Sequence, residues 1–164
     1  MISLRTIGRI LMTVAIFLAS VLPILVDITE THVLNPAWPP HARVHEVWLL
    51  STGAGVGAIA LWLIWRQRQL VLAAVLTACI LGGFLLAAAT APLYGGVLVD
   101  PQTAHLMPNN DQVLGIPANL FAFSLAFVIL LIGLALGRVE RSECRPRSAS
   151  GDGGPDAGTP ANSR

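Results

Sequence analysis

Four long apolar segments constrain the fold of this chain more than any other feature. A helix needs about 20 mainly apolar residues to cross the roughly 30 Å hydrocarbon core of a bilayer. Four segments reach that length, namely residues 7–26, 47–65, 70–91 and 117–137. None has a charged side chain near its middle, because Arg9 lies within one turn of the start of the first segment. We therefore predict an all-α, polytopic membrane protein folded as a four-helix transmembrane bundle.

The composition supports this fold and excludes several classes of protein. Charged residues make up 12% of the chain, against about a quarter in an ordinary soluble domain. The net charge of +1 and the lack of a phosphate-binding Gly-rich loop exclude a nucleic-acid partner. Cys79 lies in an apolar run and Cys144 in a polar tail, so neither a disulfide framework nor a zinc finger is expected. The lipid bilayer is the predicted partner.

The arginine residues predict the orientation in the membrane, since all ten basic residues are arginine. They precede the first segment (Arg5, Arg9), fill the turn between the second and third (Arg66, Arg68), and follow the fourth (Arg138, Arg141, Arg145, Arg147). The other two connections hold only Arg43. The positive-inside rule then places both termini in the cytoplasm of a multi-pass protein of the cell membrane. The first segment is longer than the apolar core of a signal peptide, so we expect a retained anchor.

Two domains follow from the change in composition near the C-terminus. Residues 1–141 form the four-span transmembrane domain. Residues 142–164 are rich in Arg, Ser, Gly and Pro and have too few apolar side chains to offset the entropy of ordering them. We predict a disordered cytoplasmic tail there.

Small residues predict close helix contacts. Gly53 with Gly57, and Gly133 with Gly137, have the small-x-x-x-small spacing that lets helix backbones approach in lipid. We favour packing inside one bundle, while a homodimer or a contact with another membrane protein stays an alternative.

Most groups that exchange protons near neutral pH fall in the two outer connections or at their helix junctions. They are His32, His41, His45 and His105, with Asp27, Glu30, Glu46, Asp100 and Asp111. Any polar site is therefore expected to face outward.

The second helix is expected to start near Pro40, since proline suits the first turn of a helix. At about 100° per residue, His41, His45, Trp48 and Thr52 fall in one narrow arc, while Glu46 points about 100° away from His45. We predict acid–base residues Glu46, His45 and Asp27. The predicted ligand-binding residues are His41, Trp38, Trp48, Thr52 and Asn119, of which Asn119 is expected to face inward.

A metal site is the alternative use of the histidines. His41 and His45 are four residues apart on one helix face, a spacing that can bind a divalent metal, and His32 would add a third ligand. No other cofactor is predicted. Interfacial histidines that bond to headgroups or loop groups are the competing interpretation.

The connection 95–115 is long for a structureless loop and contains several turn-forming residues. It is interpreted either as a lid over an outer crevice or as a solvated connector.

The segment NPAWPPHARVHE, which opens at Asn35, resembles one found in uncharacterised four-helix bacterial and fungal integral membrane proteins. The Asn-Pro-x-Trp-Pro-x-His-Ala core carries the resemblance, which covers about the first hundred residues and implies no activity. The order of elements is also similar to that of EXPERA proteins, which are four-span relatives of sterol isomerases. That likeness is architectural, and no catalytic position is carried over.

Three functions remain open. The first is binding or conversion of a lipid-like molecule of the sterol or isoprenoid type at the outer face. The second is an accessory subunit of a larger membrane complex without an active site of its own. The third is metal binding by the outer histidines. Ion conduction ranks last, because no ionisable group lies deep in the spans.

Overall fold

The computed structural model describes residues 2–143, except for the side chains of residues 110 and 140–143. The chain is mostly helical. Its helices are α1 (Leu4–Ser20), α2 (Leu22–Asp27), α3 (Pro40–Trp62), α4 (Leu70–Thr90) and α5 (Ala118–Glu143). Most of the predicted tail, 142–164, lies outside the described residues, and α5 runs to its last described position.

Helices α1 and α2 form one interrupted span. Ser3 caps the start of α1, where its hydroxyl accepts a hydrogen bond from the backbone N–H of Thr6 at 3.2 Å. Pro23 is the second residue of α2, and proline removes a helical hydrogen bond and crowds the preceding turn. The two pieces nevertheless give a single apolar stretch, Leu4–Asp27.

The second span begins at Pro40, as predicted, and Pro40 occupies the first turn of α3. Beyond Trp62 the helix widens into a π-helical turn, Leu63–Gln67, and stops at Arg68, whose φ of 56° lies in the left-handed region. Helix α4 starts two residues later. The predicted short turn between the second and third spans is therefore present.

Glycines bring α1 and α5 into backbone contact, the most extensive contact between helices in the bundle. A Cβ atom placed on Gly8 would lie 2.5 Å from the backbone nitrogen of Gly137 and 2.6 Å from the carbonyl oxygen of Gly133. The predicted Gly133 and Gly137 pair thus packs within the chain, with Gly8 as a partner that the spacing did not reveal. Of the other pair, Gly57 contacts Ser20, whereas Gly53 faces open space.

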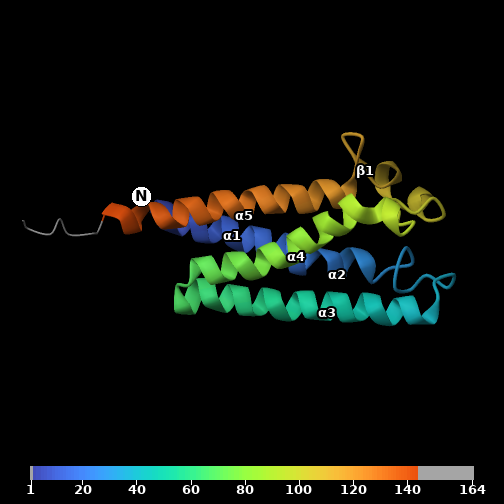
Figure 1. Cartoon of the computed structure of the whole chain (residues 1–164), viewed down its shortest axis with the longest axis horizontal. Coiled ribbons are helices and arrows are strands. Elements are labelled where there is room, and N and C mark those ends of the chain that lie inside the picture. Colours follow the sequence, from blue (N-terminus) through green and yellow to red (C-terminus); the bar gives the residue numbers. More distant parts are fainter. Residues whose placement is uncertain (1, 144–164) are drawn as a thin grey trace, which may run out of the picture.

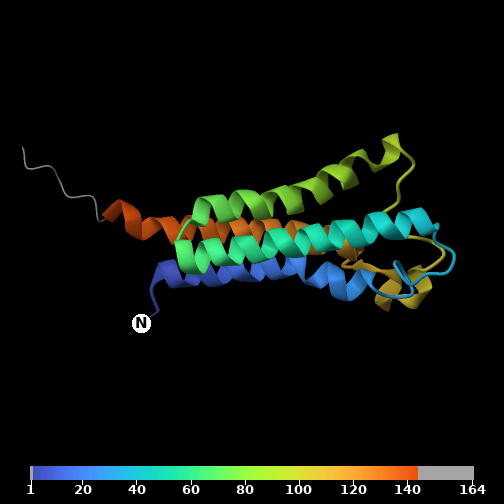
Figure 2. The same ribbon diagram turned by 90° about the horizontal axis from the view of Figure 1, so that it is seen from below.

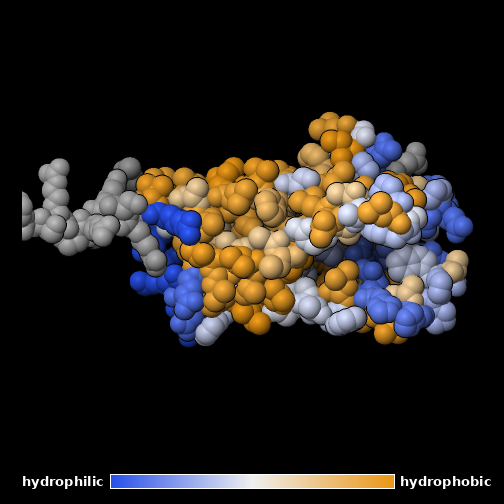
Figure 3. All heavy atoms as spheres, in the orientation of Figure 1, coloured by the Kyte–Doolittle hydropathy of each residue, from blue (hydrophilic) through white to orange (hydrophobic). Residues whose placement is uncertain are grey.

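An apolar belt covers the middle of the bundle on the face shown in Figure 3. Each candidate span buries between 22% and 28% of its most apolar window inside the protein, so most of its apolar side chains point outward. Contiguous apolar surface of this extent is a liability in water and suits contact with lipid chains. The four helices are long and apolar enough to cross a membrane.

The two ends of the bundle differ in their connections (Figures 1 and 2). Residues 2 and 143 and the turn between α3 and α4 lie at one end, here called the terminal end. The opposite, loop end carries the connections 28–39 and 94–117.

The second of these connections contains the one departure from an all-helical fold among the described residues. Two short 3-10 helices, Ala104–Leu106 and Pro108–Asn110, precede the antiparallel strands β1 (Gln112–Val113) and β2 (Ile116–Pro117). Leu114 and Gly115 join the strands with φ values of 55° and 78°, a pair of positive values typical of a tight hairpin turn.

Candidate functional site

Asn35 fixes the course of the first loop. Its side-chain oxygen accepts a hydrogen bond from the backbone N–H of Ala37 at 2.9 Å. Its backbone carbonyl accepts another from Nη2 of Arg43, on the first turn of α3, at 2.6 Å. These bonds give the Asn-Pro-x-Trp segment a structural role, because they tie the loop to the helix that follows.

His32 lies within this loop and faces α2. Thr29 gives its hydroxyl proton to the carbonyl of Val26 at 2.7 Å, so the 2.8 Å bond between Thr29 and Thr31 must be donated by Thr31. The 2.9 Å bond between Thr31 and His32 then requires the proton on Nδ1 of His32. The same Nδ1 lies 3.7 Å from Oδ1 of Asp27, which is beyond hydrogen-bond distance.

Four titratable residues at the loop end influence one another electrostatically, and we call them the acid–histidine cluster. They are Asp27, His32, Glu46 and Asp111. The charge of Asp27 acts on Glu46, and the charge of His32 acts on all three carboxylates. Burial raises the pKa of the Asp111 carboxyl above its ordinary value, and the charge of His32 opposes part of that rise. The predicted acids Asp27 and Glu46 therefore lie close enough for the charge of one to act on the other.

The hydrogen bonds and ion pairs of the described residues do not join these acids to the predicted partners His45 and His41. His41 and His45 lie exposed on the outer surface of α3, with their Nε2 atoms 2.9 Å apart. His32 takes the place beside Asp27. The 100° offset between His45 and Glu46 explains the separation, because one side of α3 faces the cluster and the other faces away from the protein.

The predicted ligand-binding residues Trp48 and Trp38 also lie in different surroundings. Trp48 is 67% exposed, and with His45, Leu49 and Thr52 it lines a shallow groove of about 290 Å³ along α3. Trp38 instead packs edge-on against His32, with ring centroids 5.4 Å apart.

Asn119 is partly buried and holds the second loop in place. Its Nδ2 donates to the carbonyl of Leu98 at 3.0 Å, and its Oδ1 accepts from the backbone N–H of Leu120 at 2.7 Å. Both ends of this side chain are therefore engaged within the protein.

The three-histidine metal site is not assembled. Within residues 2–143, no group of three or more His, Cys, Asp or Glu side chains is close enough to hold a metal ion. His32 bonds to Thr31 and packs edge-on against Trp38, whereas His41 and His45 form a separate pair.

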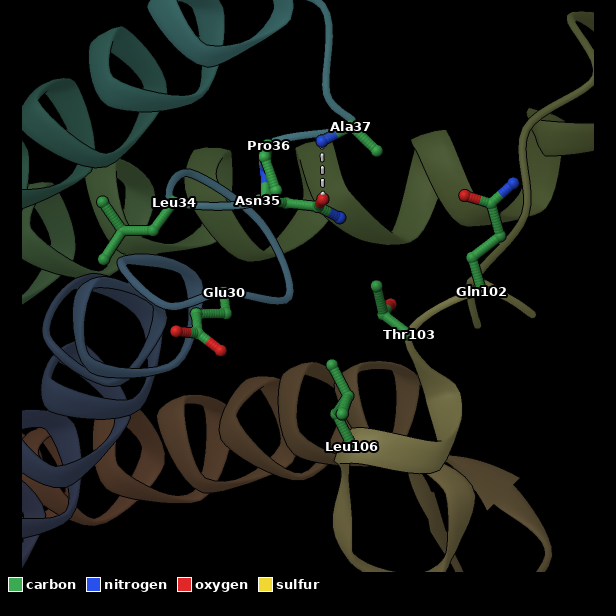
Figure 4. Close-up of a pocket in the computed structure, with 8 residues that line it drawn as sticks. All are labelled: Glu30, Leu34, Asn35, Pro36, Ala37, Gln102, Thr103 and Leu106. Atoms are coloured by element: carbon green, nitrogen blue, oxygen red, sulfur yellow. Dashed lines mark hydrogen bonds between the residues drawn. The ribbon is translucent and has the colours of Figure 1, made fainter.

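A larger groove lies between the two loops, and we call it the outer groove. The space-filling surface is hollowed at this end (Figure 3), and the volume is about 610 Å³. Its lining residues come from both connections: Glu30, Leu34, Asn35, Pro36, Ala37, Gln102, Thr103 and Leu106 (Figure 4). They include one carboxylate and neither arginine nor histidine.

Two buried polar side chains of the outer groove have unused hydrogen-bonding groups. Asn35 is 7% exposed and Thr103 is 8% exposed. The Asn35 oxygen is bonded to Ala37, while its amide nitrogen has no hydrogen-bond partner among the described residues and turns away from that bond (Figure 4). The Thr103 hydroxyl likewise has none within the described part of the chain. The groove thus offers a donor from one loop and a donor–acceptor from the other.

Sequence reasoning did not single out Asn35, Gln102 or Thr103 as ligand-binding residues. Two signals pointed toward them. Asn35 opens the distinctive segment, and the second loop has the length typical of functional loops. Periodicity does not show which loop side chains face each other.

The sequence of this chain is similar to that of a known family. A family of unknown function, DUF6640, matches residues 11–149. The chain belongs to the DUF6640 family. The match begins within α1 and includes helices α2 to α5 and both loops of this DUF6640 protein, in agreement with the expected uncharacterised family, but it tests neither the Asn-Pro-x-Trp segment nor the EXPERA likeness. Searches among curated proteins and among solved structures gave no significant match to it.

Proposed function

We propose that this DUF6640 protein binds the polar end of a lipid-like molecule in the outer groove. The orientation proposed with it places the loop end outside the cell membrane and both termini in the cytoplasm. The distribution of arginines supports that orientation. Arg5 and Arg9 belong to the start of α1, and Arg66 and Arg68 belong to the turn between α3 and α4, both at the terminal end. Among the described residues, Arg43 in the first turn of α3 is the one arginine near the loop end.

The observation that carries the proposal is the pair of hydrogen-bonding groups on Asn35 and Thr103, which line the outer groove and have no partner among the described residues. Water reaches these groups in the open groove. A ligand that supplies an oxygen to the Asn35 amide and a hydrogen-bonding group to Thr103 replaces that water, and each such bond contributes about 0.5–1.5 kcal/mol net. The volume of about 610 Å³ falls within the range of small-molecule pockets.

The lining favours a headgroup that is hydroxyl-bearing and not anionic. Among the residues that the structure describes, Glu30 is the only charged one that lines the groove, and it repels a phosphate or carboxylate. An alcohol of the sterol or isoprenoid type has both the hydroxyl that Asn35 and Thr103 require and an apolar body that suits the belt. The side chains of Leu34 and Leu106 add apolar surface to the same groove.

Thr103→Val tests the proposal, because it removes the hydroxyl and nearly preserves the shape. Thr52→Val is the matched control on the shallow groove of α3. Purified full-length protein is incubated with membrane lipid extract, and bound lipid is measured by native mass spectrometry. We expect about 2- to 10-fold weaker binding for Thr103→Val, equivalent to one lost hydrogen bond, and wild-type binding for Thr52→Val.

The proposal fails if the wild-type protein carries no lipid, or if Thr103→Val binds as well as the wild type. Weaker binding by Thr52→Val alone would indicate that the ligand binds in the shallow groove along α3 and not in the outer groove. A stable stoichiometric protein partner, with no bound lipid, would favour the accessory-subunit alternative.

Conversion of the bound molecule is a second candidate, favoured by the acid–histidine cluster. Asp27 and Glu46 supply carboxylates for proton transfer, and His32 replaces His45 as the neighbouring imidazole. Altered lipid products that disappear in Glu46→Gln, while lipid binding persists, would distinguish conversion from binding alone.

A further inference from the structure

The exposed pair His41 and His45 is independent of the outer groove and has a geometry of its own. Both residues lie on the first two turns of α3, and both are exposed. Their Nε2 atoms are 2.9 Å apart, and their rings meet at 90° with centroids 4.5 Å apart. The two ring nitrogens that face each other are those that a shared ion would contact.

The separation of the two nitrogens, which their hydrogen bond sets, is compatible with one ion that contacts both. Metal–imidazole bonds are about 2.0–2.1 Å long. At that length, two nitrogens 2.9 Å apart subtend an angle of about 90° at the metal, whereas a tetrahedral site needs a separation of about 3.3 Å. An angle of 90° is the angle between neighbouring ligands in square-planar or tetragonal copper(II) and nickel(II) sites. Copper(II) also binds nitrogen ligands most tightly of the first-row divalent ions.

We propose that His41 and His45 form a two-nitrogen binding site for copper(II) on the surface of α3. At present one Nε2 carries the proton of the shared hydrogen bond. Binding requires that ring to move its proton to Nδ1 and the two exposed rings to turn away from the line between their nitrogens, so that both Nε2 lone pairs point at the metal and no net proton is released. Water completes the coordination, because the described residues place no third His, Cys, Asp or Glu within reach.

Trp48 provides a local reporter of this site. Its ring lies 6.0 Å from the ring of His45, close enough for a paramagnetic ion at the pair to quench its fluorescence. Quenching by copper(II) should therefore fall strongly in Trp48→Phe although binding itself remains.

The experiment titrates copper(II) into untagged, full-length protein in detergent, with tryptophan fluorescence and electron paramagnetic resonance as readouts. We expect one copper(II) per chain with a spectrum of two coordinating nitrogens, and weaker binding of zinc(II). His41→Ala and His45→Ala should each weaken copper binding at least about ten-fold, because each removes one of the two nitrogen ligands that the protein supplies. His105→Ala, which removes a histidine from the second loop, is the matched control and should bind as the wild type does.

Copper binding that survives in the His41→Ala, His45→Ala double variant would overturn the proposal. So would a wild-type protein that binds no copper(II), or one whose binding falls equally in His105→Ala. Retained folding of each variant is checked by circular dichroism.

Discussion

At the scale of single residues, the loop end gathers carboxylates that share a partly desolvated environment. Asp111 follows the second 3-10 helix of the second loop, and its φ of 60° lies in the left-handed region. Burial disfavours its charged form, so its pKa is raised in the folded protein. Such a group favours folding while it is protonated and loses that contribution as the pH rises through its raised pKa.

Asp111→Asn is therefore expected to alter the pH dependence of stability. Asparagine tolerates a positive φ, so the substitution removes the charge without straining the backbone. The variant should match the wild type below the ordinary Asp pKa of 3.8 and become the more stable of the two as the pH rises toward neutrality. Thermal unfolding in detergent between pH 3 and pH 7 measures this difference, and a variant that loses stability relative to the wild type over this range would contradict it.

At the scale of elements, glycine determines how closely the helices approach. The α1–α5 contact has no room for a side chain at Gly8, because the neighbouring atoms belong to the backbone of α5 and not to flexible side chains. In lipid, where apolar surfaces gain little from meeting each other, such close backbone packing is a main source of helix association.

Gly8→Ala and Gly53→Ala form a matched pair that tests this packing. Alanine at position 8 must push the helices apart, and overpacking of this kind costs about 1–3 kcal/mol. Alanine at position 53 meets no atom within 4 Å and should be neutral or stabilising by up to about 1 kcal/mol, given the higher helix propensity of alanine. Thermal unfolding in one detergent compares them, and equal stability of the two variants would refute the α1–α5 contact.

Helical elements were also the features that the sequence predicted best. Length and hydropathy located all four spans, and the proline rule located the start of α3. Helical periodicity also predicted that one side of α3 carries His41, His45, Trp48 and Thr52. The helix break at Val21 is a local effect of Pro23 that hydropathy does not detect. The contact of Gly8 with Gly133 and Gly137 depends on tertiary packing, which periodicity does not encode.

At the scale of the whole molecule, an apolar belt separates two polar ends that differ in chemistry. The terminal end is rich in arginine, while the loop end has the histidines and most carboxylates. The candidate site lies mainly in loops, which explains why the sequence predicted it poorly. The course of residues 28–39 depends on the bond between Arg43 and Asn35, and the outer groove exists because a second loop lies opposite.

The central claim is that this groove opens on the outer side of the cell membrane. Cysteines are introduced as Gln102→Cys in the groove and Gln67→Cys at the terminal end, in a background where Cys79 and Cys144 are replaced by alanine. Intact cells are then treated with a membrane-impermeant maleimide. We predict labelling of Gln102→Cys in intact cells and of Gln67→Cys only after permeabilisation, and the reverse pattern would contradict the account.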